Sequence, residues 1–241
     1  MQIRYIHFET IDSTNLWAKN NAANFNPDQF TCITASEQTA GKGRLNRNWI
    51  SPKGLNIYAT FYFTLPKGCP FLAQLAQVLS LSCATVLKAK GFQPEIKWPN
   101  DITLAGKKVS GILCEILDMK DYYGIVIGIG VNVNMESDLL QTIDQPATSL
   151  AQISGKKWDL KEILTPLVEQ FIKDLDILKS EKFSYFFEEY NKLLAFKGKM
   201  ITLNPTPARA QVSGICKSID REGRLLLLLP SGEMMKLTSL D

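Results

Sequence analysis

A basic, glycine-containing segment spans residues 37–49 and ends in Trp49. Glycine lets a backbone pass close to a ligand. The cationic groups of Lys42, Arg44 and Arg47 can cradle phosphate oxygens, and the indole offers a flat face to a nucleotide base. The segment therefore indicates a phosphate-binding loop. The alternative is a basic surface loop that ends in a core tryptophan.

A second group of polar residues is the Lys-Trp-Pro-Asn-Asp sequence at 97–101, which is followed by Lys107 and Lys108. Pro99 fixes the chain direction and disfavours helix at the preceding residue. The carboxylate of Asp101 could hold Mg²⁺ or an adenine amino group, and the lysines could meet a leaving pyrophosphate. The alternative is an ordinary turn with solvated charges.

A third group lies on a predicted strand at 123–134. Side chains alternate between the two faces of a strand, so alternate residues from Ile125 to Val133 form an apolar face that we expect to pack on a core. The other face carries Gly128 and Gly130, and glycine inside a strand often marks a close approach. With Gly111 beside it, this face predicts the floor of a ligand slot. The alternative is a flat surface for helix packing.

A fourth group is Asp-Ser-Thr-Asn at 12–15. The hydroxyls of Ser13 and Thr14 could bind a polar ligand group. Ser13 or Asp12 is also a favourable helix cap, which is the structural alternative.

The composition limits the function classes. The chain has 241 residues, 45% of them hydrophobic, and a net charge of +3, which indicates one or two globular domains without the clustered basic face typical of DNA-binding proteins. Five scattered cysteines and one histidine, His7, argue against a disulfide framework or a multi-histidine metal site. We expect a cytoplasmic protein, because the sequence shows no signal peptide and no apolar run of roughly 20 residues.

The hydrophobic pattern predicts an α+β fold. Strands are expected at 3–8, 30–36, 55–63, around 96, at 109–117 and at 123–134, and helices at 13–21, 71–90, 159–179 and 181–195. Short strands at 199–203, 209–219, 224–229 and 233–238 predict a small β-barrel. The expected domains are therefore residues 1–196 and 197–241.

The four groups, in this order, resemble the biotin–protein ligase family. That family carries Ser-Thr-Asn, a Gln-x-x-Gly-Arg-Gly-Arg-x-Gly-Arg-x-Trp loop, Lys-Trp-Pro-Asn-Asp, Lys-x-x-Gly-Ile-Leu and Gly-x-Gly-x-Asn, and all are recognisable between residues 12 and 134. The resemblance implies a mixed-sheet catalytic domain followed by an SH3-like barrel. It also implies that biotin and ATP form biotinyl-5′-adenylate, and that biotin then passes to a lysine of a biotin carboxyl carrier protein, a subunit of acetyl-CoA carboxylase or a related carboxylase.

The resemblance also implies roles for individual residues. Lys108 would bridge the biotin carboxylate and the α-phosphate, and Arg44 would lie on the loop that retains the adenylate. Biotin contacts would come from Ser13, Thr14, Gln38, Gly41, Lys42, Lys108, Gly111 and Gly130. ATP contacts would come from Arg44, Arg47, Trp49, Lys97, Asn100, Asp101 and Asn132. Mg²⁺ would arrive with ATP, with Asp101 as a contact, and no tightly bound metal is expected.

Three departures from the family loop bear on adenylate retention: Lys42 replaces an arginine and cannot form its bidentate fork, Leu45 follows Arg44, and Asn46 replaces the last glycine. About a dozen residues precede Ser13, so we expect no DNA-binding domain; we also expect no membrane association, and a homodimer is possible. One alternative function is a lipoate or octanoate ligase or transferase. An alternative of another class is a non-catalytic biotin or nucleotide sensor.

Overall fold

The structure is a computed structural model that describes residues 2–203 and 211–238. The chain divides into two compact units. The first unit comprises Met1–Pro70 and Leu104–Glu169, and the second comprises Phe71–Thr103 and Gln170–Asp241. The boundary predicted at 196/197 remains a prediction.

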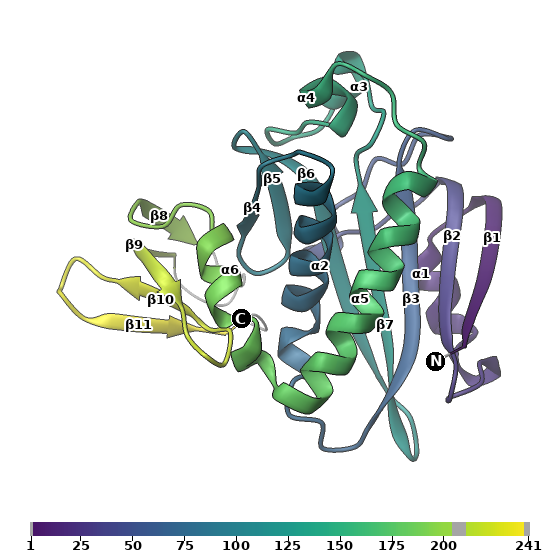
Figure 1. Cartoon of the computed structure of the whole chain (residues 1–241), viewed down its shortest axis with the longest axis horizontal. Helices are drawn as coiled ribbons and strands as arrows, with labels where there is room; N and C mark the ends of the chain where they lie inside the picture. The colour runs from purple at the N-terminus through teal and green to yellow at the C-terminus, as the bar shows by residue number, and fades with distance from the viewer. Residues whose placement is uncertain (1, 204–210, 239–241) are drawn as a thin grey trace. The chain divides into compact units, whose positions relative to one another are not determined.

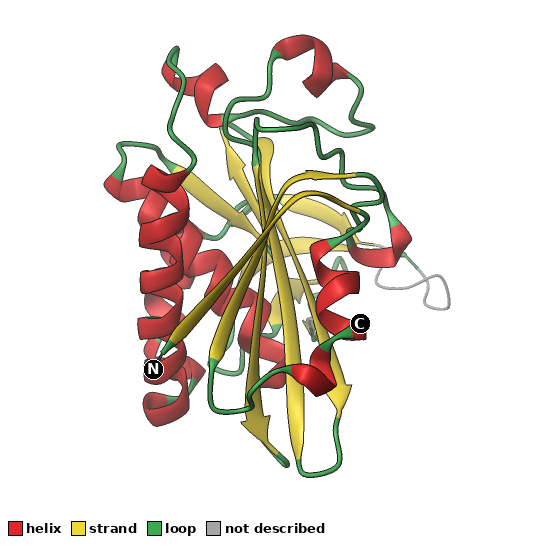
Figure 2. Cartoon of the chain, turned by 90° about the vertical axis from the view of Figure 1, so that its right-hand side faces the viewer, coloured by secondary structure: helices red, strands yellow, loops and turns green. Residues whose placement is uncertain are grey.

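The first unit is built on long strands in the order β1-β2-β3-β7-β6 (Figures 1 and 2). β1 and β2 are parallel, and each later pair in this order is antiparallel. The parallel pair needs a crossover, which the helix α1 supplies. The bounds are β1 (Ile3–Ile11), β2 (Phe30–Gln38), β3 (Ile57–Pro66), β6 (Lys107–Asp118), β7 (Tyr122–Val131) and α1 (Thr14–Asn20).

The two faces of β7 differ as the sequence predicted. Ile125, Ile127 and Ile129 are at most 3% exposed and form part of the core. Gly128 and Gly130 lie on the opposite face, and Gly130 is paired with Gly111 of β6. Two glycines therefore lie side by side on neighbouring strands. Because they have no side chains, groups that cover this face can contact the strand backbone directly.

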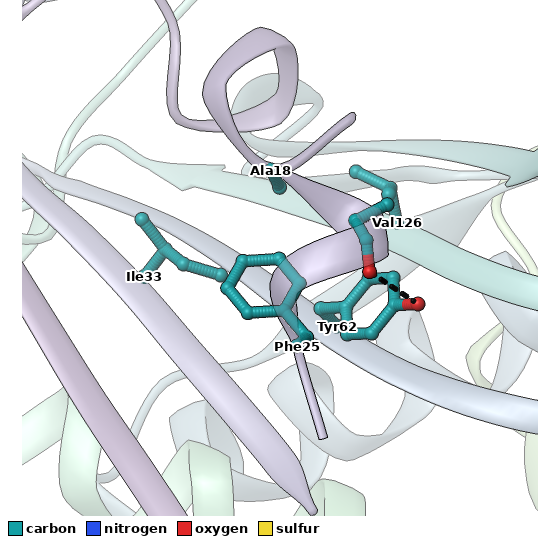
Figure 3. Close-up of a cluster of buried hydrophobic side chains, with 6 residues drawn as sticks. Ala18, Phe25, Ile33, Tyr62 and Val126 are labelled. Atoms are coloured by element: carbon teal, nitrogen blue, oxygen red, sulfur yellow. Dashed lines mark hydrogen bonds between the residues drawn. The ribbon is translucent and has the colours of Figure 1, made fainter. Parts of the chain in front are cut away.

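Helix α1 covers the glycine face of the first unit and packs against β2, β3 and β7. Ser13 is its N-cap, with the side-chain oxygen accepting from the Leu16 N–H. An apolar cluster then fixes the helix and the short 3₁₀ turn η1 (Ala22–Asn24) on the sheet (Figure 3). The cluster comprises Ala18, Ala22, Phe25, Ile33, Tyr62 and Val126. The start of α1, where the hydroxyl motif lies, is therefore held by buried contacts.

The remainder of the first unit contains short helices that the sequence analysis did not predict. They are α3 (Ser137–Gln141) and α4 (Leu150–Ser154). The first part of α5 (Lys161–Glu181) follows them, close to the helix predicted at 159–179. Asn134 connects the start of this segment to its end at Trp158. Its side-chain amide donates to the Trp158 carbonyl and accepts from the Trp158 N–H. Helices of five residues carry too little periodicity to be read from sequence alone.

The second unit combines helices, two short strands and a separate four-stranded antiparallel sheet ordered β11-β10-β9-β8. This sheet supports the predicted SH3-like barrel. The side-chain amide of Asn191, on helix α6, donates to the Ile219 carbonyl of this sheet and accepts from the Ile219 N–H. The elements are η3 (Leu72–Gln74), α2 (Leu75–Ala89), β4 (Pro94–Lys97), β5 (Asp101–Leu104), the rest of α5, η4 (Phe183–Tyr185), α6 (Phe187–Leu193), β8 (Met200–Leu203), β9 (Val212–Ile219), β10 (Leu225–Leu228) and β11 (Met234–Leu237). Positions 209 and 210 of the predicted strand lie outside the described residues.

Among the described residues, the segment Leu72–Ala89 is long and apolar enough to cross a membrane by length and composition, which the sequence analysis had not expected. Of this window, 61% is buried inside the chain. Such burial is typical of a core helix, and α2 supplies much of the buried apolar surface of the second unit.

Asp174 is a buried carboxylate in the second unit, on α5. It is 6% exposed and accepts hydrogen bonds from Ser82 Oγ at 2.7 Å and Gln170 Nε2 at 2.9 Å. Burial raises the pKa of this carboxyl, and the two hydrogen bonds offset only part of the rise. Because the folded-state pKa lies above that of the unfolded chain, the stability associated with this group is present at acid pH and is lost as the pH rises through the folded pKa.

We expect Asp174→Asn to stabilise the protein at neutral pH by about 1 kcal/mol, because the neutral amide avoids the burial of a charge. The gain should shrink as the pH falls through the raised folded pKa and should disappear at about pH 4, below which the carboxyl is protonated in both the folded and the unfolded chain. Urea unfolding across this pH range measures both. Asp176→Asn, on the exposed side of α5, is the matched control and should change little. A gain independent of pH would contradict the assignment.

Candidate active site

The hydroxyl motif and the start of the basic segment meet at the N-terminus of α1. Gln38 Oε1 accepts from the Thr14 N–H at 2.9 Å and lies 3.0 Å from Thr14 Oγ1. Ser13 and Thr14 are both buried, at 3% and 4% exposure. The structure thus brings together three residues that were predicted to contact biotin, and their polar atoms form one end of the site.

Four residues outside the predicted site extend this polar cluster. Thr60 Oγ1, on β3, lies 2.8 Å from Thr14 Oγ1 and donates to Asn15 Oδ1 at 2.6 Å. Asn15 Nδ2 donates to Glu115 Oε2 at 3.1 Å, on β6. Lys19 Nζ pairs with the other Glu115 oxygen at 2.7 Å. A continuous chain of polar contacts therefore runs from Gln38 to a half-buried ion pair.

Gly41 is required by the close packing of the loop behind Gln38. A Cβ at this position would lie 2.7 Å from the Trp49 carbonyl and 2.8 Å from Ser51 Oγ. Ser51 Oγ donates to that same carbonyl at 2.9 Å and accepts from Gln38 Nε2 at 3.1 Å. The glycine and the serine thus connect the polar end of the site to the backbone of Trp49.

The basic loop between Gly41 and Trp49 folds back on itself. Lys42 and Asn48 form an antiparallel bridge, and the Gly43 N–H donates to the Arg47 carbonyl at 2.7 Å. Arg44 begins a short 3₁₀ turn, η2 (Arg44–Asn46). Within this turn Leu45 adopts a left-handed conformation, with φ 55°. Such a backbone is strained for a leucine, at roughly 1–2 kcal/mol.

The indole of Trp49 lies on the paired glycines. A Cβ at Gly130 would lie 2.5 Å from Trp49 Nε1 and 2.6 Å from Cζ2, and a Cβ at Gly111 would lie 3.1 Å from Cζ3. Lys108 Nζ lies 5.5 Å from the centroid of the indole ring, within cation–π range. Trp49, Lys108, Gly111 and Gly130 therefore form a second cluster, in which an ammonium group lies over a flat aromatic ring.

Protein side chains cover the glycine floor predicted from the sequence. Trp49 lies on Gly130, and Asn15 lies on Gly128, where a Cβ would overlap its Oδ1 and lie 2.9 Å from its Cγ. Trp49 Nε1 is buried and has no hydrogen-bond partner among the residues that the structure describes. An indole therefore lies on the glycine floor with its Nε1–H shielded from water.

Asn132 is 2% exposed and donates from Nδ2 to the Thr148 carbonyl at 3.1 Å. The Thr148 N–H in turn donates to the Lys108 carbonyl at 2.9 Å, and the Lys108 N–H donates to Pro146. In this structure the predicted nucleotide contact Asn132 braces the backbone that carries Lys108.

A cavity of about 640 Å³ adjoins this corner, and Lys107, Pro146, Ala147 and Thr148 are among its lining residues. Its volume is in the range of small-molecule sites, about 300–1,000 Å³. A neighbouring cavity of about 490 Å³ is lined by residues between Asn134 and Lys157. The residues predicted to contact biotin line neither cavity.

The Lys-Trp-Pro-Asn-Asp turn belongs to the second unit. Trp98 Nε1 donates to the Gly223 carbonyl at 3.0 Å, and Tyr190 donates to the Pro99 carbonyl at 3.3 Å. Lys97 is exposed at the end of β4, and Asp101 opens β5 after Asn100. The turn is thus anchored within its own unit.

In the described part of the chain, no three His, Cys, Asp or Glu side chains gather in a way that could hold a metal ion. The five cysteines are free thiols, and burial raises the pKa of Cys32 and Cys114 to about 12. His7 lies on exposed strand surface, within hydrogen-bond distance of Thr34 and Ser36.

Thr60, Glu115 and Ser51 were missed by the sequence analysis. A threonine inside the apolar run of β3 was one available signal, because a buried hydroxyl needs a partner. Glu115 follows the Gly-Ile-Leu segment and is charged within a strand. Neither signal predicts that both side chains contact Asn15, because that contact depends on where α1 lies on the folded sheet.

Gly130→Ala tests the packing of the indole. We expect a loss of about 1–3 kcal/mol in unfolding free energy, because a rigid ring must move to admit a methyl group. Gly111→Ala is the graded control and should lose at most about 1 kcal/mol, since its closest neighbours include the flexible end of Lys108. Urea unfolding and tryptophan fluorescence measure both variants. Equal losses, with no change in fluorescence, would contradict the placement of Trp49.

Comparisons with known proteins identify the family of this chain. Residues 7–132 match the model of the Biotin/lipoate A/B protein ligase family. The chain is 34% identical to the "Bifunctional ligase/repressor BirA" of Bacillus spizizenii, over 98% of this chain and 72% of that protein. It is 30% identical to the "Biotin--[acetyl-CoA-carboxylase] ligase" of Paracoccus denitrificans, over 93% of this chain and 94% of that protein.

A solved structure is similar over nearly the whole chain. The biotin protein ligase from Aquifex aeolicus in complex with biotin and ATP superposes with a TM-score of 0.83 at 31% identity, covering 97% of this chain and 95% of that one. The family match covers both the hydroxyl motif and the glycine strand. The chain therefore belongs to the Biotin/lipoate A/B protein ligase family.

Proposed function

We propose that this protein is an ATP-dependent biotin–protein ligase. The observation that carries the proposal is the arrangement of the first unit, where a buried polar cluster at Thr14 and Gln38 connects through Ser51 to the corner formed by Trp49 and Lys108. Such a site suits a substrate with a polar ring at one end and a carboxylate at the other. Relatives named as biotin ligases support biotin as that substrate.

The first step joins biotin to the nucleotide. A biotin carboxylate oxygen attacks the α-phosphorus of ATP, and the bond to the β-phosphate oxygen breaks, giving biotinyl-5′-adenylate and pyrophosphate. Both reactants are anions, so an ammonium group between them lowers their repulsion. Lys108 is suited to this role, because the strand around it is braced by hydrogen bonds to Pro146 and Thr148. Mg²⁺ would arrive with the triphosphate as part of the substrate.

In the second step a carrier lysine attacks the adenylate carbonyl carbon and AMP leaves. We propose a biotin carboxyl carrier protein as the acceptor, on the strength of relatives that are named for acetyl-CoA carboxylase. A mixed anhydride hydrolyses in water, so the loop from Gly41 to Trp49 would protect it. Because the indole covers Gly130, a substrate that reaches the glycine floor must displace it.

The residues predicted to contact ATP belong to different units of the chain. Arg44 and Arg47 lie on the basic loop of the first unit. We propose that these two residues contact ATP. The contacts predicted at Lys97, Asn100 and Asp101, which belong to the second unit, stay predictions. The cavity beside Lys107 has the volume for a nucleoside and adjoins the braced strand of Lys108.

Acyl-adenylate formation separates the candidate functions. The protein is incubated with ATP and Mg²⁺ and either biotin or lipoate, and each adenylate is measured by mass spectrometry. We expect biotinyl-5′-adenylate and little lipoyl-adenylate. The reverse preference would favour a lipoate ligase, and no adenylate from either acid would favour a non-catalytic sensor.

Lys108→Ala should lower the rate of biotinyl-adenylate formation by about 10²- to 10³-fold, because a positioned charge is lost from the reacting phosphate. The melting temperature should stay near that of the wild type. Lys120→Ala is the matched control, since this lysine is exposed in the turn between β6 and β7. Near-normal turnover of Lys108→Ala, or an equal loss in both variants, would remove Lys108 from this role.

A further inference from the structure

The polar cluster at the end of the site has fewer hydroxyl hydrogens than its contacts require. Three oxygen–oxygen contacts connect four residues: Asn15 Oδ1 with Thr60 Oγ1 at 2.6 Å, Thr60 Oγ1 with Thr14 Oγ1 at 2.8 Å, and Thr14 Oγ1 with Gln38 Oε1 at 3.0 Å. Each contact needs one hydrogen between its oxygens. The two threonine hydroxyls supply only two.

The orientation of Asn15 is fixed by neighbours that can only accept. Its Nδ2 faces Glu115 Oε2 at 3.1 Å and the Leu113 carbonyl at 3.3 Å, and neither atom can donate. Its Oδ1 must therefore face Thr60, and the single Thr60 hydrogen must go to it. Asn15 is held in place because its amide lies directly on Gly128.

The orientation of Gln38 is fixed in the same way from the other side. Its Oε1 accepts from the Thr14 N–H, which can only donate. Its Nε2 faces Ser51 Oγ, whose own hydrogen goes to the Trp49 carbonyl at 2.9 Å. Gln38 Oε1 therefore points into the cluster as an acceptor.

We propose that Glu115 and the Leu113 carbonyl, through Asn15 and Thr60, set the hydrogen-bond polarity of the site so that its end can only accept. Thr60 gives its hydrogen to Asn15, and Thr14 then gives its hydrogen to Thr60, the nearer of its two oxygen neighbours at 2.8 Å against 3.0 Å for Gln38. The remaining contact, between Thr14 Oγ1 and Gln38 Oε1, then has two acceptors and no hydrogen. A ligand N–H directed at this pair supplies the missing donor.

The inference rests on the proposed function and deepens it, because it assigns a reason for selecting one acid. The fused ring of biotin carries ureido N–H donors, whereas the dithiolane ring of lipoate carries none. A site built for a hydrogen bond discriminates strongly against an analogue that lacks the group. Glu115, Asn15 and Thr60 are positioning residues, since they act through Thr14 and Gln38.

Lys19 distinguishes this relay from a merely structural ion pair. Its Nζ contacts Glu115 Oε1, while Asn15 contacts Oε2. The side chains of Lys19 and Glu115 are 32% and 29% exposed, so the carboxylate remains an acceptor without its partner. Removing Lys19 should therefore leave the polarity intact, whereas removing the Thr60 hydroxyl should not.

Titration of the full chain with biotin alone, by calorimetry, tests the relay. Thr60→Val keeps the side-chain shape but removes the hydroxyl. The Thr14 hydroxyl then donates to Gln38 Oε1, and this oxygen is no longer available to a ligand N–H. We expect biotin to bind about 10- to 100-fold more weakly. Thr60→Ser and Lys19→Met should bind within about threefold of the wild type. In turnover, Thr60→Val should raise the KM for biotin, with kcat and the KM for ATP nearly unchanged.

Near-wild-type binding by Thr60→Val, or an equal loss in Thr60→Ser, would overturn the relay while leaving the ligase proposal in place. No binding of biotin by the wild type would overturn the ligase proposal itself. If Thr60→Val does not fold, Thr60→Ala replaces it, because that change also removes the hydroxyl. That variant should bind biotin more weakly than Thr60→Ser, and equal binding by the two would overturn the relay.

Discussion

The close approach of Asn15 and Trp49 to the backbone of β7 is the contact on which the rest of the site depends. Gly128 and Gly130 lack side chains, so the amide of one residue and the indole of the other lie directly on the strand. A methyl group at either position would overlap them. The glycines therefore fix both the hydroxyl motif at the start of α1 and the end of the basic loop, which are far apart in sequence.

These two contacts place two kinds of chemistry in one unit. On the Asn15 side, hydroxyls and amides form a buried cluster whose hydrogen bonds run in one direction. On the Trp49 side, an ammonium group stands beside an aromatic ring, on a strand braced through Thr148. Ser51 connects the two sides. A substrate with a donor at one end and a carboxylate at the other satisfies both.

Much of this could be predicted from the sequence, because alternation along β7 and the hydroxyl motif before α1 are local patterns. The family resemblance is confirmed by the comparisons. The sequence could not reveal which side chains cover the glycines, since Asn15 and Trp49 reach them only in the folded sheet. Thr60 and Glu115 were missed for the same reason. The left-handed residue of the loop is Leu45, although Asn46 tolerates that conformation better.

A crystal structure of the protein with bound biotin tests the central claim most directly. The account predicts a ureido N–H within hydrogen-bond distance of Thr14 Oγ1 or Gln38 Oε1, the carboxylate directed toward Lys108, and the indole of Trp49 moved from Gly130. Biotin bound away from Thr14 and Gln38, or with its ring carbonyl oxygen against them in place of an N–H, would contradict it.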